Sequence, residues 1–381
     1  MKLIQIFNGK ILTPQGWINN GSILVNEGRI LAITGSSLPL ENAEMFDASG
    51  HYVIPGYVAM NIYGAAGSQF HDATDEAFNT IITTHLAHGT TTIFPTVGAV
   101  GYDKLLKTGK ICTKLMEGGN RIIGGLHIVG PYLSPEITKG RYEVKLPDRS
   151  KYEKVVSELP CIKRWDAAPE LPGAQQFARF LTRKGILAAI SHTMAEYGDV
   201  KAGFDAGFVH AAQLYNAMAG FHKRREYKYE GTVESVLLID EMTTEVIADL
   251  VHLPETILRL VYKLKGVERT ALVTAALRYA AYDGEELPFS KVYIENGICK
   301  LKSDGTLAGG ISTMDQLVKN MVIRAEVPFE DAVRMASETP ARIMNVIDRV
   351  GTLEKGKDAD ILLLDHQYNL TSVWSKGVRI F

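Results

Sequence analysis

Tyr-Val-Ala-Met-Asn-Ile-Tyr, residues 57–63, is a short and almost wholly apolar run. A second run of this kind, Thr-Thr-Thr-Ile-Phe-Pro-Thr at 90–96, follows after a helix-like segment at 75–88. Strands that are buried on both faces of a parallel sheet have this pattern, because the crossover helices cover both faces. The alternation predicts βα units from residue 52 onward.

Six more apolar runs follow, so the chain has eight: 57–63, 90–96, 122–129, 162–169, 185–192, 208–216, 245–252 and 270–275. Helix-like segments separate most of them, at 75–88, 104–116, 173–184, 196–206 and 254–264. Eight units favour a closed (β/α)8 TIM barrel over an open doubly wound sheet. A turn signal in the stretch 291–302 predicts a hairpin inserted after the eighth strand.

Both ends of the chain have a β-rich pattern with turn signals instead of the βα alternation. The last thirty residues are too few to bury a core alone, so we expect them to complete the sheet begun at the N-terminus. The prediction is a small β-sandwich domain made of residues 1–51 and 346–381, with the barrel, residues 52–345, between them.

The composition is that of an ordinary globular protein, with 46% hydrophobic and 22% charged residues and a formal net charge of -2. Nucleic acids and anionic membranes are usually bound by markedly basic surfaces, so neither partner is expected. No apolar run reaches the roughly 20 residues of a membrane-spanning helix, and the N-terminal residues do not resemble a signal peptide. We therefore expect a cytoplasmic protein. The cysteines form no motif for a metal or a disulfide framework.

Polar residues stand where the predicted strands end, which is where barrels of this class carry their active sites. Two histidines, His192 and His252, and two carboxylates, Glu170 and Asp249, are among them. They permit a metal site or an acid–base site, and hence a hydrolase. Structural roles remain open, because a zinc site needs three or four ligands and Glu170 is equally suited to cap a helix.

A series of short motifs runs through nearly the whole chain at spacings that suit a barrel. They include Pro55-Gly56-Tyr57-Val58, Gly89-Thr90-Thr91, Gly125-Leu126-His127 with Gly130-Pro131, Ala168-Pro169-Glu170, Ser191-His192-Thr193, Leu214-Tyr215-Asn216-Ala217-Met218, Ile247-Ala248-Asp249 with His252, and Gly356-Lys357-Asp358-Ala359-Asp360. In this order they resemble the N-acetylglucosamine-6-phosphate deacetylase family of the amidohydrolase superfamily.

The resemblance implies a metal-dependent amide hydrolase of amino-sugar catabolism that forms a homodimer, in which the partner helps to close the sugar-phosphate site. It also implies that Asn216, the backbone of Ala217, Arg224 and His252 contact the substrate. A guanidinium group suits a phosphate. The alternative for Asn216 is that it ties a loop, and for Arg224 that it is a solvated surface charge.

The departures from the family pattern concern the chemistry. His192 is the one metal ligand retained, while Val129 stands where the family has a ligating Glu and Gln213 where it has a ligating His. Ala275 stands where the family has the Asp that transfers protons, so no catalytic residue is identified. A single imidazole does not hold zinc tightly.

We therefore expect a deacetylase-like pseudoenzyme that binds a small sugar phosphate and needs no cofactor. The first alternative is a working deacetylase with a rearranged single-metal site, holding a divalent metal such as zinc through His192, Gln213 and an unidentified ligand. The second is a different, metal-independent barrel enzyme that uses Asp249, His252 or Glu170.

Overall fold

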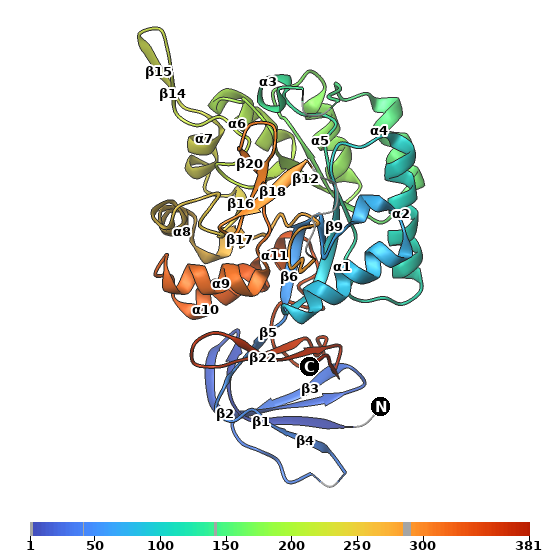
Figure 1. Cartoon of the computed structure of the whole chain (residues 1–381), viewed down its shortest axis with the longest axis vertical. Helices are drawn as coiled ribbons and strands as arrows, with labels where there is room; N and C mark the ends of the chain where they lie inside the picture. Colours follow the sequence, from blue (N-terminus) through green and yellow to red (C-terminus); the bar gives the residue numbers. More distant parts are fainter. Residues whose placement is uncertain (1–2, 41, 141–142, 285–290) are drawn as a thin grey trace.

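The computed structural model describes residues 3–40, 42–140, 143–284 and 291–381. It has two parts (Figure 1): a barrel of alternating strands and helices, and a smaller sheet that carries both chain ends. The first barrel strand follows directly on a strand of the smaller sheet. The C-terminal ends of the barrel strands, here called the mouth, therefore face away from that sheet.

The barrel is a parallel sheet of eight strands with the neighbour order β6, β9, β10, β11, β12, β13, β16 and β17. Their bounds are β6 Tyr57–Ile62, β9 Thr90–Val97, β10 Leu126–Val129, β11 Ile162–Ala167, β12 Leu187–Ile190, β13 Phe208–Ala211, β16 Thr243–Val246 and β17 Thr270–Leu272. The first strand also meets the segment after the last one, because the Ala275 amide donates to the Asn61 carbonyl of β6 at 3.1 Å. The predicted (β/α)8 barrel is confirmed, and each predicted run overlaps one strand.

The helices of the barrel pack on its outside, and the predicted helix-like segments correspond to five of them. The α-helices are α1 Asp75–Ala87, α2 Tyr102–Glu117, α3 Pro135–Thr138, α4 Arg149–Glu158, α5 Ala174–Arg183, α6 Tyr197–Ala206, α7 Thr232–Leu238, α8 Glu255–Arg269, α9 Met314–Ile323, α10 Phe329–Ala336 and α11 Glu338–Ile343. Thr74 shows how the sequence starts one of them: its hydroxyl accepts from the Ala77 amide at 3.1 Å and so caps α1. Every helix of the described ranges is too short or too polar to cross a lipid bilayer.

The smaller sheet joins strands from the two chain ends. It contains β1 Ile4–Thr13, β2 Gly16–Asn26, β3 Arg29–Thr34, β4 Glu44–Asp47, β5 Tyr52–Pro55, β21 Ile361–Leu364, β22 Leu370–Ser375 and β23 Val378–Arg379. The contact between the ends is the antiparallel pair β5–β21. The predicted small β domain from both termini is thus confirmed, whereas the limits 1–51, 346–381 and 52–345 stay a prediction.

Short β elements extend from the mouth. The hairpin β14 His222–Arg224 with β15 Tyr227–Tyr229 projects far from the barrel (Figure 1). A three-stranded sheet, β18 Val292–Glu295, β19 Ile298–Leu301 and β20 Leu307–Gly309, follows the eighth strand and includes the hairpin predicted at 291–302. A small pair, β7 Gly64–Ala65 with β8 Ser68–Gln69, and the short 3-10 helix η1 Phe70–Asp72 follow the first strand.

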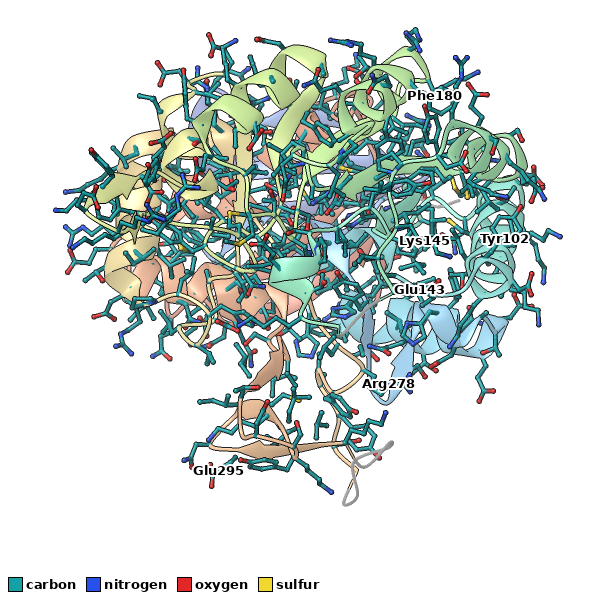
Figure 2. The ribbon with its side chains drawn as sticks, turned by 90° about the horizontal axis from the view of Figure 1, so that it is seen from above. Tyr102, Glu143, Lys145, Phe180, Arg278 and Glu295 are labelled. Carbon is teal, nitrogen blue, oxygen red and sulfur yellow. The ribbon has the colours of Figure 1, made fainter. Side chains whose placement is uncertain are left out.

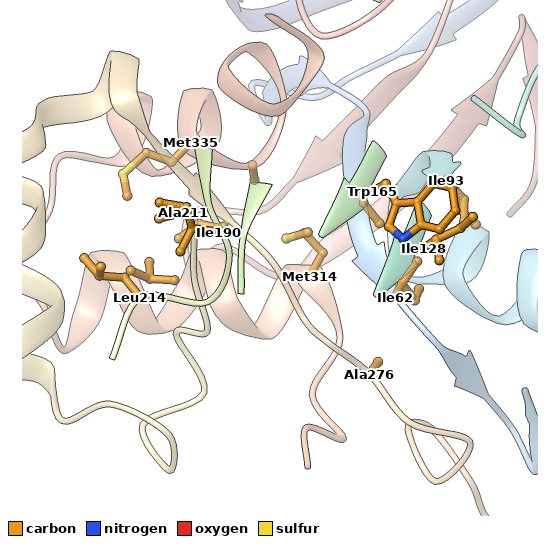
Figure 3. Packing of buried hydrophobic residues seen from close by; sticks show 14 of the residues in the cluster. Ile62, Ile93, Ile128, Trp165, Ile190, Ala211, Leu214, Ala276, Met314 and Met335 are labelled. Carbon is orange, nitrogen blue, oxygen red and sulfur yellow. The ribbon is translucent and has the colours of Figure 1, made fainter. Parts of the chain in front are cut away.

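The core lies inside and around the barrel strands. Figure 3 shows Ile62, Ile93, Ile128 and Trp165, which come from the adjacent strands β6, β9, β10 and β11, gathered in one group. The Trp165 indole is held in place because its Nε1 donates to the Gly130 carbonyl at 2.8 Å. This packing fixes the positions from which the side chains of the mouth project.

Candidate functional site

The mouth contains a pocket of about 440 Å³ that is formed by the segments following seven of the eight strands. Six of the side chains singled out in the sequence line it together: Val129, His192, Gln213, Asn216, His252 and Ala275. The fold therefore brings residues more than 140 positions apart in the chain to one small volume. The roles assigned to them by resemblance stay predictions.

The backbone at three of these positions is in the left-handed region. The φ angles are 47° at His192, 46° at Gln213 and 45° at Ala275. Non-glycine residues rarely adopt this conformation, and it persists only where the surrounding structure holds it. At all three positions the chain turns sharply at the mouth and presents its side chain to the pocket.

The donor groups in the pocket do not fit a metal ion. Val129 and Ala275 offer no lone pair, and the Gln213 side-chain oxygen accepts from Asn216 Nδ2 at 2.7 Å. His192 Nδ1 lies 2.8 Å from the Ser191 hydroxyl, so this ring nitrogen is engaged by a neighbour in the chain. In the described ranges, no three His, Cys, Asp or Glu side chains are placed to hold a metal, although zinc sites use three or four.

A histidine–carboxylate pair lies at the edge of the pocket. His252 Nδ1 is 2.7 Å from Asp249 Oδ2, and both side chains are only 5% exposed. Asp249 Oδ1 also accepts from the amides of Val251 and His252, at 2.9 and 2.8 Å. Burial raises the pKa of Asp249, but the contacts with the His252 ring and the hydrogen bonds from the two backbone amides together outweigh it and leave that pKa below its ordinary value. The ionised carboxylate thus keeps a proton on His252 Nδ1 and leaves Nε2 as the ring atom for a ligand.

A fully buried polar cluster lies inside the barrel. Its centre is the Arg164 guanidinium, which donates to Asp166 at 2.7 and 2.9 Å and to Glu245 at 2.6 and 3.2 Å. His127 Nε2 lies 3.0 Å from Asp166, and His210 Nε2 lies 3.3 Å from Glu245. The sequence carries one signal of this cluster. Arg164 and Asp166 are two positions apart in a largely apolar strand, and alternate residues of a strand point to the same side.

The charges of this cluster determine the protonation of its members. Burial raises the pKa of Glu245 and of Asp166, but the Arg164 charge, the hydrogen bonds from Arg164 and the contacts with the adjacent histidines together outweigh it, so both carboxyls have lowered pKa values and stay ionised. Burial and then the Arg164 charge lower the pKa of His127. Burial also lowers the pKa of His192 in the pocket above, although the Asp166 charge opposes that shift. The imidazoles of His127 and His192 are therefore mainly neutral at neutral pH.

Other candidates lie away from the pocket. Glu170 accepts from the Thr193 hydroxyl at 2.6 Å and from the Met194 amide at 2.9 Å, so it orders the segment after His192. Arg224 is on the projecting hairpin, where it pairs with Glu196 at 2.7 Å and stacks on the Tyr229 ring at 3.8 Å. Neither Arg224 nor Ala217 is among the residues that line the pocket as the structure describes it.

The sequence reasoning missed two polar residues of the pocket, Gln69 and His71, which come from the excursion after the first strand. Burial, followed by the nearby charge of Lys104, lowers the pKa of His71. Both residues lie outside the strand ends, so the pattern of buried strands did not point to them. Tyr63, at the end of the first strand, also lines the pocket.

Comparison with known proteins agrees with this architecture. Residues 52–380 match the model of the amidohydrolase family. The chain is 28% identical to an N-acetylglucosamine-6-phosphate deacetylase of Lysinibacillus sphaericus, covering 98% of this chain and 96% of that protein. It is also 28% identical to the Haemophilus influenzae protein of the same name, with 98% of each covered.

Solved structures show the same likeness. The crystal structure of N-acetylglucosamine-6-phosphate deacetylase from Pasteurella multocida aligns with a TM-score of 0.92 at 26% identity over 99% of each chain. A mutant of the Mycobacterium smegmatis deacetylase in complex with N-acetyl-D-glucosamine-6-phosphate aligns with a TM-score of 0.90 at 26% identity over the full length of both. The chain belongs to the amidohydrolase family, and over nearly its whole length it is similar to proteins named N-acetylglucosamine-6-phosphate deacetylase.

Proposed function

We propose that this protein binds N-acetylglucosamine 6-phosphate, or a closely related N-acylated amino-sugar phosphate, and does not hydrolyse it by the metal-dependent route. The observation that carries the proposal is the pocket itself. It combines left-handed backbone turns at His192, Gln213 and Ala275 with aliphatic side chains at Val129 and Ala275, where the resemblance implies a metal ligand and a proton-transferring Asp. These features support a site that holds a ligand without the groups for its hydrolysis.

The magnitudes support loss of turnover. A general acid–base group contributes about 10²–10⁴-fold and a metal-activated water several kcal/mol, within total accelerations of roughly 8–23 kcal/mol. Ala275 carries no proton, and the donor set does not fit a metal. Without both contributions, what remains is binding and orientation.

The polar side of the pocket supplies contacts for a sugar. Asn216, His192 and His252 offer hydrogen-bonding groups on three neighbouring segments. Of the described residues that line the pocket, none is a lysine or an arginine. A phosphate there lacks a permanent cation from the same chain.

We therefore also propose a homodimer in which the projecting hairpin of one copy delivers Arg224 to the mouth of the other. Two aromatic side chains near Arg224 favour contact between this hairpin and a second surface, because Phe221 and Tyr227 are 62% and 63% exposed. An Arg224→Ala variant then binds the sugar phosphate more weakly without losing the fold. Arg225→Ala is the matched control on the same hairpin. Sedimentation velocity measures the dimer, and an exclusively monomeric protein with full affinity contradicts this proposal.

The binding proposal is tested by calorimetric titration with N-acetylglucosamine 6-phosphate, combined with an assay for released acetate. We expect saturable binding and no acetate, with or without added zinc. Release of acetate that a chelator abolishes and zinc restores would establish a working metal-dependent deacetylase instead.

The His252–Asp249 pair favours a second candidate, a metal-independent enzyme that uses His252 as a general base. The 2.7 Å contact orients the imidazole in the way that general-base catalysis requires. A substrate screen of esters and amides of amino sugars tests it. Turnover that chelators do not affect and that His252→Asn and Asp249→Asn both reduce would favour this candidate.

A further inference from the structure

The mouth pocket has one polar and one apolar side. His192, Gln213, Asn216 and His252 follow β12, β13 and β16 and form the polar side. The segments after β9 and β10, which are neighbouring strands, contribute the apolar residues Ala99, Val100, Val129 and Leu133. A ligand that satisfies both sides has a polar head and an apolar arm.

The two apolar segments pack against each other. Gly130 lies between them, and a Cβ atom placed on it would be 3.0 Å from Leu133 Cδ1 and 3.4 Å from Ala99 Cβ. Ala99 and Leu133 therefore flank one spot beside Val129. The side chains on this side of the pocket are aliphatic, so they offer no donor or acceptor to the hydroxyls of a sugar.

A second cavity of about 610 Å³ lies next to this surface, and Val100 lines both cavities. Its lining is largely apolar, with Leu105, Pro131, Tyr132 and Trp165 among its residues. Tyr132 stacks on Trp165 with 5.9 Å between the ring centroids, which gives this cavity a fixed aromatic wall.

The rim of the second cavity is charged but largely compensated. Lys145 and Tyr102, both labelled in Figure 2, line it on the same side of the molecule. Lys145 Nζ lies 3.1 Å from Glu143, and Lys154 Nζ lies 3.8 Å from Glu158. Two of the three lysines that line this cavity are thus paired with a carboxylate, so we expect its apolar lining to contribute more to the choice of ligand.

We propose that the ligand's N-acyl group is longer than acetyl, and that it runs from Val129 across Val100 into the second cavity. This inference rests on the proposed function. Val129 and Ala275 stand where the family pattern has a metal ligand and the proton-transferring Asp, and an amide bond cleaved by such groups has to lie beside them. We therefore place the acyl group of a sugar held by Asn216 and His252 at these two residues. An acetyl group ends at these residues, whereas a longer acyl chain covers Val100 and Leu133 as well. Each methylene that moves from water onto apolar surface raises affinity about fourfold.

The experiment compares N-acetyl-, N-butyryl- and N-hexanoylglucosamine 6-phosphate by calorimetric titration with the full chain. We expect affinity to rise about fifteenfold from acetyl to butyryl, and further with hexanoyl. In Val100→Asp the ratio of hexanoyl to acetyl affinity falls to about 1, since a charge now stands in the apolar path. Lys151→Ala, which changes the cavity's rim but not its apolar lining, keeps the ratio of the unmodified protein.

The outcomes separate the two proposals. Binding of the N-acetyl compound with equal or weaker binding of the longer ones overturns this inference and leaves the proposed function standing. If none of the three binds, the proposed function fails, and the inference fails with it. The chain-length series uses the unmodified protein, so a variant that does not fold still leaves the inference decided.

Discussion

Replacing Arg164 by Met removes the guanidinium that pairs with both Asp166 and Glu245. Met is unbranched and flexible, so it occupies much of the space of the arginine stem without a charge. None of the three side chains has any exposed surface. Both carboxylates would then be buried without the partner that keeps them ionised.

The loss follows from the contacts. Four hydrogen bonds of 2.6 to 3.2 Å join the guanidinium to the two carboxylates. Breaking one buried ion pair by removing a partner costs about 3–5 kcal/mol, because the remaining charge is uncompensated. For Arg164→Met we expect a loss of at least that size, or a fall in Tm of roughly 6–10 °C at about 2 °C per kcal/mol.

Thermal unfolding followed by tryptophan fluorescence measures this effect, because Trp165 is buried next to Arg164 in the same strand. The triple variant Arg164→Met, Asp166→Asn, Glu245→Gln is the control, since it removes all three charges and restores most of the stability. The deficit of Arg164→Met also shrinks as the pH falls from 8 to 5. Without Arg164 the pKa values of the carboxyls rise in the folded state, which then binds more protons than the unfolded chain. A Tm within 2 °C of the unmodified protein would refute this account of the cluster.

Three further predictions concern pH, catalysis and the contact between the two parts of the fold. Burial lowers the pKa of His85 to about 4, so between pH 6.5 and 4 this imidazole is protonated in the unfolded chain and neutral in the folded one. The stability of the fold therefore falls by up to about 3 kcal/mol as the pH drops through this window. His85→Gln removes this effect, and we expect it to flatten the curve of Tm against pH. A triple variant restores the donors of the family pattern at three positions: Val129→Glu, Gln213→His and Ala275→Asp. We expect it to contain zinc by elemental analysis and to release acetate. If it contains no zinc, the pocket differs from the family's at further positions. Trp17→Ala removes a ring stack on Phe329, with 5.9 Å between the centroids, and a hydrogen bond to Glu330 at 2.7 Å. We expect it to weaken the interaction between the small β domain and the barrel by about 2 kcal/mol and to lower the Tm. An unchanged Tm would exclude that role.

Under the proposed function, the chain keeps the family's architecture without its chemistry. The left-handed turns at the strand ends depend on the packing of the barrel, whereas the donor atoms depend on which side chain each turn carries. On this proposal, Val129 and Ala275 change the donor atoms and leave the turns in place, so that a ligand site remains without a hydrolytic one.

The sequence alone determined the barrel, because buried parallel strands and crossover helices leave a local pattern that is repeated eight times. It also indicated which residues face the mouth, since His192, Gln213 and Ala275 each lie within the last four residues of a predicted run. Position along a strand is a local property, so one sequence is enough to read it.

Only the tertiary structure decided which distant groups meet. Arg164 and Glu245 are 81 positions apart, and no local pattern pairs a cation on one strand with a carboxylate on a strand that is not its neighbour. The same holds for His71, which enters the pocket from an excursion, and for Arg224, which the hairpin carries away from it. Contacts across a closed barrel depend on strand order and register, and these are set by the packing of the whole chain.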